Sequence, residues 1–394
     1  MHIPARHISE NSDAFSSYWN PKTSQYFHSK LSKNISLKDA DTFVSYYFQV
    51  DELGDAIAEE YLVKYGFAQG MGKIHQMIQS YPENLESYSE NTQKFLNQIF
   101  SVPQWVNQDL IDAGCDFSNR TGTSGLATLR DYSLMGGYES SAINKPLIFT
   151  GALKKGAVKR LSDTVVFWVN VTGKNQLKLK GKGFYSVITT RLIHSFSRIM
   201  IEKNPEWKSE LWGRPLNLWD MLATNLGFSI AYIDGLKKLG LHPTQKEIDG
   251  TLNLWKYVGY LIGIPEHLLV DTEQQAVDAL FLWSKTQKGP DTDSVALAHS
   301  LYTEPKNVTF TNSTLLKNFV YKTNLGYNWE MLGNETCAKL QIPKTKAIYW
   351  VKMICSINSI VEKYAFSSEN RYKKIVARGY KQQLEVRDLY HQEK

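Results

Sequence analysis

One segment of this chain has the composition of a β-strand, and the sequence offers it no partner strand. Residues 165–171, Val-Val-Phe-Trp-Val-Asn-Val, are rich in β-branched and aromatic side chains, which favour extended structure. A lone strand would leave backbone hydrogen-bonding groups unpaired, whereas the flanking sequence has helical periodicity. We therefore interpret this segment as a buried helix and predict an all-α fold built as a single helical domain.

Helix start and stop signals predict the elements of the first third of the chain. Helical periodicity extends from about residue 40 to residue 81, with a break expected at Gly70 and Gly72. A second helix is predicted over residues 90–100. Residues 119–125 are rich in Gly, Thr and Ser, so we expect a loop there.

The middle of the chain has the clearest helix boundaries. Asn217 is expected to cap one helix, and Gly240 is expected to end it, because glycine is common just past a helix end. Thr244 and Glu247 have the spacing of a capping box. We predict helices over residues 218–239, 244–262 and 271–287.

The predicted organisation is one helical domain with additions at both ends. Residues 1–35 form a polar, weakly ordered lead-in, residues 36–290 form the helical domain, and residues 291–394 form a helical extension that packs on it. The chain has no internal repeat and no long low-complexity linker. Its 42% of hydrophobic residues is ordinary for a globular protein with a substantial core.

The charge pattern gives no sign of a nucleic-acid partner. The net charge of +6 is mildly basic, and its basic clusters are not interleaved with a nucleic-acid-binding module. These clusters are therefore interpreted as solvated surface.

Cysteine usage and hydropathy predict a cytoplasmic protein without a transmembrane segment. Cys115, Cys337 and Cys355 lack metal-type spacing, and such a sparse, odd set is typical of reduced thiols. Residues 1–22 lack the apolar run of a signal peptide. The most apolar late stretch, 347–361, contains Lys352 and is too short to span a bilayer.

The candidate functional site centres on a histidine inside an apolar helical stretch. In Arg191-Leu-Ile-His194-Ser-Phe-Ser-Arg198, the spacing places Arg191, His194 and Arg198 on one helix face. A histidine between apolar walls is a good ligand for an iron cofactor, and neighbouring arginines suit an anionic cofactor edge. The alternative is that these three residues form the solvated stripe of an amphipathic helix.

Other common kinds of site find less support. The sequence lacks the His-Glu-x-x-His and paired Cys-x-x-Cys patterns of zinc sites, the Glu-x-x-His pair of di-iron bundles and the glycine-rich nucleotide loop. A Ser-His-acid triad is left open by the sequence, although the nucleophile-elbow motif is missing.

The order of several motifs resembles the latex clearing protein and MpaB oxygenase family. Arg160-Leu-Ser-Asp-Thr164 is followed after about thirty residues by the histidine motif. Gly-Arg-Pro-Leu-Asn-Leu-Trp-Asp at 213–220, then Thr224, and Gly-Leu-Lys-Lys-Leu-Gly at 235–240 continue the resemblance. It spans roughly residues 45–285.

This resemblance implies a globin-like helical core around haem b. It implies that His194 is the iron ligand and that Arg198, with Arg191 on the same face, supports the cofactor. It further implies Arg160, Thr164 and Thr224 as catalytic residues lining the distal side or haem edge, where polar groups govern oxygen binding. Alternatively, Arg160 ends a basic run, Thr164 caps a helix, and Thr224 bonds to its own helix carbonyl.

Three positions bear on how closely the family pattern is followed. Asp163 stands where latex clearing proteins have a lysine that can close the sixth iron position, so we expect water or an open site there. Ile199 replaces a second histidine. Glu139 is the nearest upstream carboxylate for the family's catalytic acid, and a structural role as a loop or cap residue is the alternative.

The resulting functional hypothesis is a haem b-dependent oxygenase that oxidises or cleaves a hydrophobic substrate with dioxygen. Well-studied members of the family cleave carbon–carbon double bonds of isoprenoid chains, so isoprenoids are the substrate class that the resemblance suggests. The alternative is a non-catalytic helical protein that binds a lipid or haem. The sequence does not specify the oligomeric state.

Overall fold

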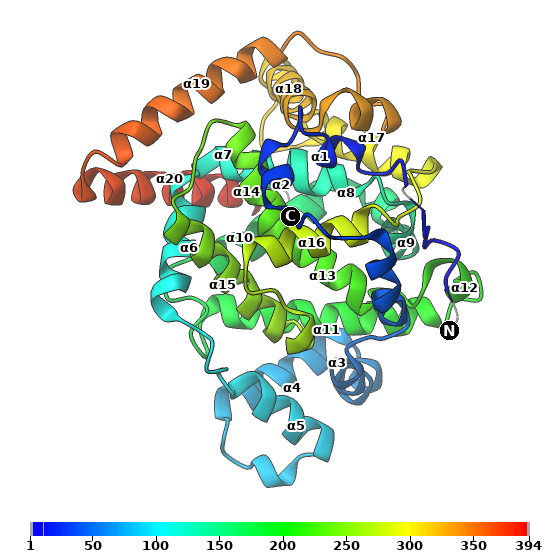
Figure 1. The fold of residues 1–394 in the computed structure, drawn as a ribbon. Helices are drawn as coiled ribbons and strands as arrows, with labels where there is room; N and C mark the ends of the chain where they lie inside the picture. Colours follow the sequence, from blue (N-terminus) through cyan, green and yellow to red (C-terminus); the bar gives the residue numbers. More distant parts are fainter. Residues whose placement is uncertain (1–2, 11, 392–394) are drawn as a thin grey trace.

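The computed structural model describes residues 3–10 and 12–391, and within them the fold is all-α (Figure 1). The extended pairing recorded in these residues is an isolated bridge between His7 and Gln287. The strand-like run 165–171 lies inside helix α10, which confirms its interpretation as a helix. The all-α prediction is therefore correct.

The helices follow one another along the whole chain, with α for α-helices and η for 3₁₀- and π-helical segments. In chain order they are α1 (Ser16–Trp19), α2 (Gln25–Lys30), η1 (Leu37–Tyr47), α3 (Glu52–Ile57), η2 (Ala58–Val63), α4 (Phe67–Ser80), η3 (Leu85–Ser87), α5 (Glu90–Phe100), α6 (Gln108–Arg120), α7 (Gly122–Thr128), η4 (Leu129–Leu134), α8 (Met135–Gly137), α9 (Ser141–Phe149), α10 (Ala152–Thr172), α11 (Lys182–Glu202), α12 (Ser209–Trp212), α13 (Leu218–Phe228), α14 (Ile230–Lys238), α15 (Gln245–Leu261), η5 (Glu266–Leu268), α16 (Glu273–Ser284), α17 (Thr292–Asn307), α18 (Thr314–Lys339), α19 (Ile348–Ala365) and α20 (Glu369–His391).

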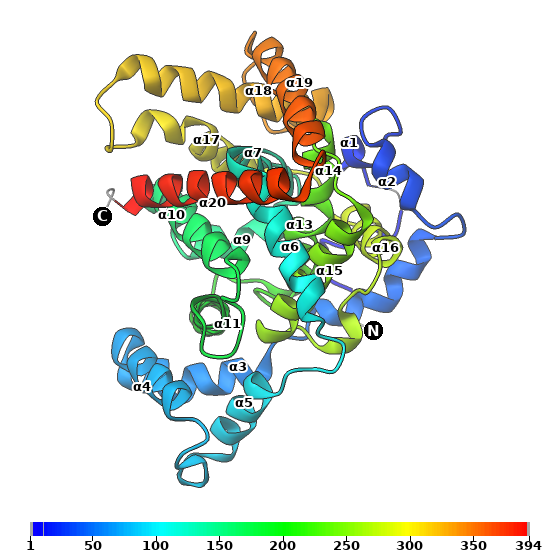
Figure 2. The ribbon, with the colours of Figure 1, turned by 90° about the vertical axis from the view of Figure 1, so that its left-hand side faces the viewer.

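Helices α6 and α15 pack closely against each other. Both views place α4 and α5 at one end of the molecule and α18 and α19 at the opposite end (Figures 1 and 2). Helix α11 lies between the α3–α5 end and the centre, and it packs on α3, α10 and α15. The candidate histidine is therefore carried by a helix with neighbours on several sides.

Several predicted boundaries are confirmed. Helix α5 covers residues 90–100 as predicted. Thr244 accepts from the Glu247 N–H, and the Glu247 side chain accepts from the Thr244 N–H, so the capping box is formed. Gly240 follows the end of α14 with φ 79°, the left-handed conformation that glycine adopts at low cost.

Two glycine-based predictions are wrong. Helix α4 continues through Gly70 and Gly72, and the chain turns instead at Gly66, where φ is 80°. Gly70 serves close packing, because a Cβ there would lie 2.3 Å from the carbonyl oxygen of Tyr61. The loop expected at 119–125 is helical, with only a turn between α6 and α7.

The helix predicted over 218–239 is interrupted at Ser229, where φ is −110° and ψ is −86°. The interruption divides it into α13 and α14. Side chains bond to the carbonyl groups beside it: the Ser229 hydroxyl donates to the Asn225 carbonyl at 3.1 Å, and the Ser133 hydroxyl donates to the Gly227 carbonyl at 2.8 Å. Hydrogen bonds from side chains thus support the break, which falls two residues after Gly227.

The N-terminal segment contributes to the core, although we expected a weakly ordered lead-in. Phe15, Tyr18 and Phe27 are buried. The division at residues 35 and 290 stays a prediction. Within the described residues, none of the helices has the length and apolar character needed to cross a bilayer.

We predict that Gly250→Ala lowers the free energy of unfolding by about 1–3 kcal/mol, the usual cost of overpacking. A Cβ at Gly250 would lie 2.6 Å from the Gly114 nitrogen and 2.6 Å from the Leu110 oxygen, so α6 and α15 would have to separate. Urea denaturation followed by circular dichroism measures the change. Gly72→Ala is the matched control, because a Cβ at this position would meet no described atom within 4 Å. This substitution should stabilise α4 by up to about 1 kcal/mol, since alanine has a higher helix propensity than glycine. Equal effects in the two variants would contradict close packing at Gly250.

Candidate active site

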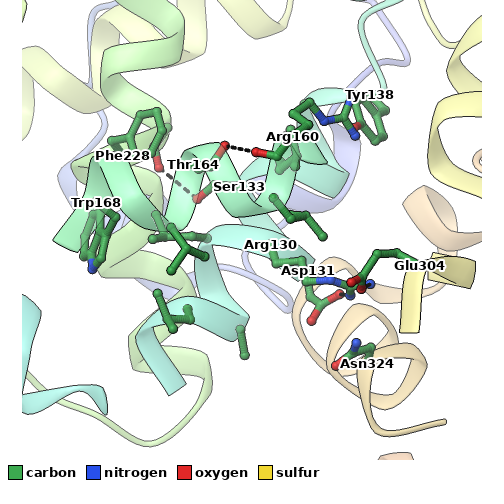
Figure 3. A pocket seen from close by; sticks show the side chains of 18 of the residues that line it. Arg130, Asp131, Ser133, Tyr138, Arg160, Thr164, Trp168, Phe228, Glu304 and Asn324 are labelled. Carbon is green, nitrogen blue, oxygen red and sulfur yellow. Dashed lines mark hydrogen bonds and ion pairs between the residues drawn. The ribbon is translucent and has the colours of Figure 1, made fainter. Parts of the chain in front are cut away.

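A cavity of about 970 Å³ lies among α10, α13, the η4–α8 segment and the helices α17, α18 and α20. This volume is at the upper end of the range for small-molecule sites. Its walls are mainly aromatic and aliphatic, with Trp168 and Phe228 on one side (Figure 3). The cavity therefore suits a large, mostly apolar ligand.

Four residues singled out from separate parts of the sequence line this cavity. They are Arg160 and Thr164 of α10, His194 of α11 and Thr224 of α13. Arg191 and Arg198 are not among the lining residues. With His194, they line a void of about 10 Å³ on α11. The structure thus separates the predicted set into a cavity group and a pair of supporting arginines.

His194 is surrounded by protein but keeps some accessible surface, because its ring lines the cavity. Burial, with a further contribution from the Arg198 guanidinium, lowers the pKa of His194 to about 4. The imidazole is therefore neutral at pH 7, which is the form that coordinates metals. Its Nδ1 atom is buried without a hydrogen-bond partner in the described part of the chain.

Arg191 and Arg198 form buried ion pairs with α3 and the residue that caps it. Arg191 Nε and Nη2 donate to the two carboxylate oxygens of Asp51 at 2.6 and 2.7 Å. Arg198 donates to Asp55, with Nη2 to Oδ1 at 2.8 Å, and also to the Leu216 carbonyl at 2.7 Å. Each arginine side chain is only 1% exposed, so the interpretation as a solvated stripe is wrong.

Arg160 projects from α10 toward Tyr138, and its Nη2 donates to the tyrosine hydroxyl (Figure 3). The guanidinium carbon lies 5.5 Å from the centre of the Tyr138 ring. Arg160 Nε is buried and has no hydrogen-bond partner among the residues described. The hydrogen bond to Tyr138 therefore orients the Arg160 side chain, while its Nε–H group has no acceptor among the residues described.

Thr164 and Thr224 bond to their own helices. The Thr164 hydroxyl donates to the Arg160 carbonyl at 2.8 Å, and the Thr224 hydroxyl donates to the Asp220 carbonyl at 2.9 Å. For Thr224 this is the alternative expected from the sequence, whereas Thr164 lies in the interior of α10 and does not cap a helix. With its proton engaged, each hydroxyl oxygen can offer only acceptor capacity to a ligand.

Asp163 and Glu139 do not line the cavity. Asp163 is exposed and pairs with Lys159 at 2.9 Å. Glu139 is fully buried, where it accepts hydrogen bonds from the Phe15 N–H at 2.7 Å and from the Thr336 hydroxyl. Burial raises the pKa of Glu139. In the structure Glu139 joins the N-terminal segment to α18, which agrees with the structural alternative.

Sequence reasoning missed a polar group at another part of the cavity wall, formed by Arg130, Asp131 and Glu304 (Figure 3). Arg130 is paired with Asp131, and its Nη2 lies 3.4 Å from Glu304 Oε2. Tyr390 donates to Glu304 Oε1 at 2.7 Å. Asp131 Oδ2 and Arg130 Nε are buried and lack hydrogen-bond partners within the described chain.

A sequence signal for this group existed. Arg130 and Asp131 are the sole charged residues between positions 121 and 138. The segment is helical, and charges isolated in such a stretch have to be paired if they are buried. They fall in the π-helical turn η4, a conformation that is frequent at functional sites.

The residues present fit an iron-porphyrin cofactor in four respects. A neutral histidine lines the cavity, its Nδ1 atom is an orphan, and the walls are mainly apolar. Arg160 supplies a cation in the same cavity, as an anionic cofactor edge requires. The donor set therefore suits a group held by one imidazole.

A family model described as ER-bound oxygenase mpaB/B'/rubber oxygenase, catalytic domain, matches residues 123–353. This match covers more than half of the chain. The chain belongs to this family. The matched region contains all six of the site residues predicted from the sequence. It also contains the missed Arg130, Asp131 and Glu304.

A solved structure shares the helical fold of this chain. The structure entitled "Structure of Latex Clearing Protein LCP in the closed state" aligns with a TM-score of 0.60 at 14% sequence identity. The alignment covers 91% of this chain and 95% of that one. At this identity the likeness shows a shared helical fold. A comparison with curated proteins gives no match.

We predict a distinct pH signature for Asp131. Burial raises the pKa of Asp131 from its ordinary value of 3.8 to about 6, despite the neighbouring Arg130 guanidinium. Between about pH 4 and 6 the folded state then holds a proton that the unfolded state has released. The contribution of Asp131 to the free energy of unfolding should therefore fall as the pH rises through this window, by on the order of 2–3 kcal/mol.

Urea unfolding of the wild type and of Asp131→Asn at several pH values tests this expectation. The stability of the wild type minus that of the variant should fall from pH 4 to 6 and change little above. Asp163→Asn is the control, because its exposed carboxylate should contribute less than about 0.5 kcal/mol. A difference that rises with pH would show that the pKa of Asp131 is depressed in the folded protein.

Proposed function

We propose that this chain is a haem b-dependent oxygenase that oxidises or cleaves a hydrophobic substrate with dioxygen, with an isoprenoid chain as the preferred substrate class. The main support is that Arg160, Thr164, His194 and Thr224, identified separately in the sequence, line one large apolar cavity. Membership of the oxygenase family agrees with this function.

Under this proposal His194 holds the cofactor iron. Its depressed pKa keeps the ligand neutral down to about pH 4, so protons do not compete for it at physiological pH. The pairs that Arg191 and Arg198 make with α3 and its cap hold α11 in place on both sides of His194. Bound haem would supply the activation of dioxygen, which no side chain can provide.

The remaining cavity residues shape the environment of the reaction. Arg160, oriented by Tyr138, presents a fixed positive charge and can donate a hydrogen bond from Nε after a small shift. The aliphatic and aromatic walls exclude water and accept an apolar chain. Asp131 can hold a proton up to about pH 6, because burial raises its pKa to that value. We assign it the role of candidate acid in place of Glu139, which does not line the cavity.

The alternative function is a carrier that holds a lipid or haem without catalysis. The two functions differ in a direct measurement, because an oxygenase consumes dioxygen when its substrate is added and a carrier does not.

Among the described residues the three cysteines form no disulfide. This agrees with the proposed cytoplasmic location, where thiols stay reduced.

We predict that His194→Ala abolishes haem retention. The purified wild type should show a Soret band, with α and β bands after reduction by dithionite, and the variant should show none at equal protein concentration. His75→Ala is the control, because His75 is a partly buried histidine of α4 that bonds to Thr189 at 3.1 Å. A normal Soret band in His194→Ala would refute the ligand assignment.

A rescue experiment separates ligation from a folding defect. His194→Gly leaves space for a free imidazole beside the cavity, so added imidazole should restore the Soret band if the ring acts as a ligand. Circular dichroism should show unchanged helix content. A folded variant that imidazole does not rescue would argue that His194 is structural.

We also predict that Arg160→Leu weakens haem retention only in part, because His194 still holds the iron. Oxygen uptake per bound haem should fall on the order of 10- to 1,000-fold, because a preorganised charge is lost from the cavity. An oxygen electrode with polyisoprenoid substrates measures the rate. Lys159→Gln changes the neighbouring exposed charge and should leave the rate unchanged. Equal rates in wild type and Arg160→Leu would remove Arg160 from the mechanism.

A further inference from the structure

Helix α19 has an apolar stripe whose side chains are largely exposed in the described part of the chain. Its residues recur at spacings of three and four, which places them on one helix face. Their exposed fractions lie between 44% and 74%. The stripe consists of Tyr349, Met353, Ile357, Ile360 and Tyr364. Large apolar side chains exposed in a continuous row mark an interaction surface.

The opposite face of α19 already packs on the protein. Val351 and Ala365 are fully buried there, and Glu362 accepts from the His242 N–H at 2.7 Å. The apolar stripe is therefore not the face that anchors α19 to the fold. Folding of this domain leaves most of the stripe exposed, and the Arg371 guanidinium lies 4.8 Å from the centre of the Tyr364 ring at its end.

Helix α18 extends the stripe into a broader surface. Leu315 is 85% exposed, and the Phe319 ring lies 6.2 Å from the ring of Trp350 at the start of α19. Both views place these helices at the outer end of the molecule (Figures 1 and 2). We call this surface the α18–α19 face. It comprises Leu315, Leu316, Phe319, Val320, Tyr349, Trp350, Met353, Ile357, Ile360 and Tyr364.

The α18–α19 face adjoins the cavity. Leu316, Phe319 and Val320 line the cavity and are at the same time 38–53% exposed. The cavity therefore reaches the surface beside the apolar stripe, so a ligand leaving the cavity here meets apolar side chains first.

Charge identifies the kind of surface that this face fits. Between residues 340 and 366 the exposed charged side chains are Lys344, Lys346, Lys352 and Lys363, while Glu362 is buried. Helical spacing places Lys352 and Lys363 along one border of the stripe. Apolar residues bordered by lysines, with tyrosine and tryptophan among them, are typical of helices that lie in the interface of an anionic bilayer.

We propose that the α18–α19 face docks the protein on the surface of a membrane containing anionic phospholipids and presents the cavity opening to the lipid. Without docking, an apolar substrate would have to cross water to reach the cavity. Docking lets it pass from the acyl region along the stripe instead. The docking step depends on this face alone and not on the cofactor, so it can fail or succeed independently of the proposed oxygenase function.

Vesicle flotation of the full-length protein tests the docking. The probes are vesicles of phosphatidylcholine alone and of phosphatidylcholine with phosphatidylserine. We expect binding to the anionic vesicles that weakens with salt. The triple variant Met353→Ser/Ile357→Ser/Ile360→Ser should lower the partition coefficient roughly tenfold or more. Lys352→Gln should lower it about fivefold on the anionic vesicles.

The matched control is Val102→Ser/Leu179→Ser, which removes apolar side chains of similar exposure, 48% and 41%, far from the face in sequence. It should bind as the wild type does. All of these positions are exposed, so circular dichroism should confirm that each variant folds. Equal vesicle binding by the wild type and the triple variant would overturn the proposal.

A second copy of the chain is the rival occupant of this face. Sedimentation velocity over a range of protein concentrations distinguishes the two. A dimer that the triple variant abolishes, in a protein that does not float with vesicles, would show that the face is a subunit interface and would refute membrane docking. Failure to float with either vesicle type would also refute it.

Discussion

Two buried arginine–aspartate pairs set the position of α11, and the candidate site depends on that helix. Arg191 with Asp51 and Arg198 with Asp55 stand on either side of His194 along the helix. Removing one partner from such a pair typically costs 3–5 kcal/mol, since the other charge stays buried. The same charges act on the site, because Arg198 helps to keep the His194 ring neutral.

Two groups of polar side chains line different parts of the same cavity. His194 and Arg160 line it from α11 and α10, and the Arg130–Asp131–Glu304 group lines it from elements of η4 and α17. Apolar walls around them lower the effective dielectric constant, which strengthens the influence of each buried charge. An apolar substrate in this cavity would meet few polar groups. The side chains of these two polar groups would therefore determine how it is oriented.

The sequence predicted what depends on local periodicity and failed where distant segments meet. The strand-like run at 165–171 could be assigned to a helix, because a single strand has no partner. The aspartates that pair with Arg191 and Arg198 lie about 140 residues away along the chain, so no local pattern reveals them. Gly70 was misread because a glycine required for close packing looks the same in sequence as one that ends a helix.

The cavity wall joins segments from widely separated parts of the chain, from Phe15 and Tyr18 at α1 to Leu389 and Tyr390 of α20. During synthesis the early wall residues emerge long before α20 and would expose apolar surface until it arrives. Contacts of such large sequence separation slow folding. A ligand that contacts both the early wall segments and α20 would bind only when all of them are folded. Its binding free energy would then add to the cooperativity of the whole domain.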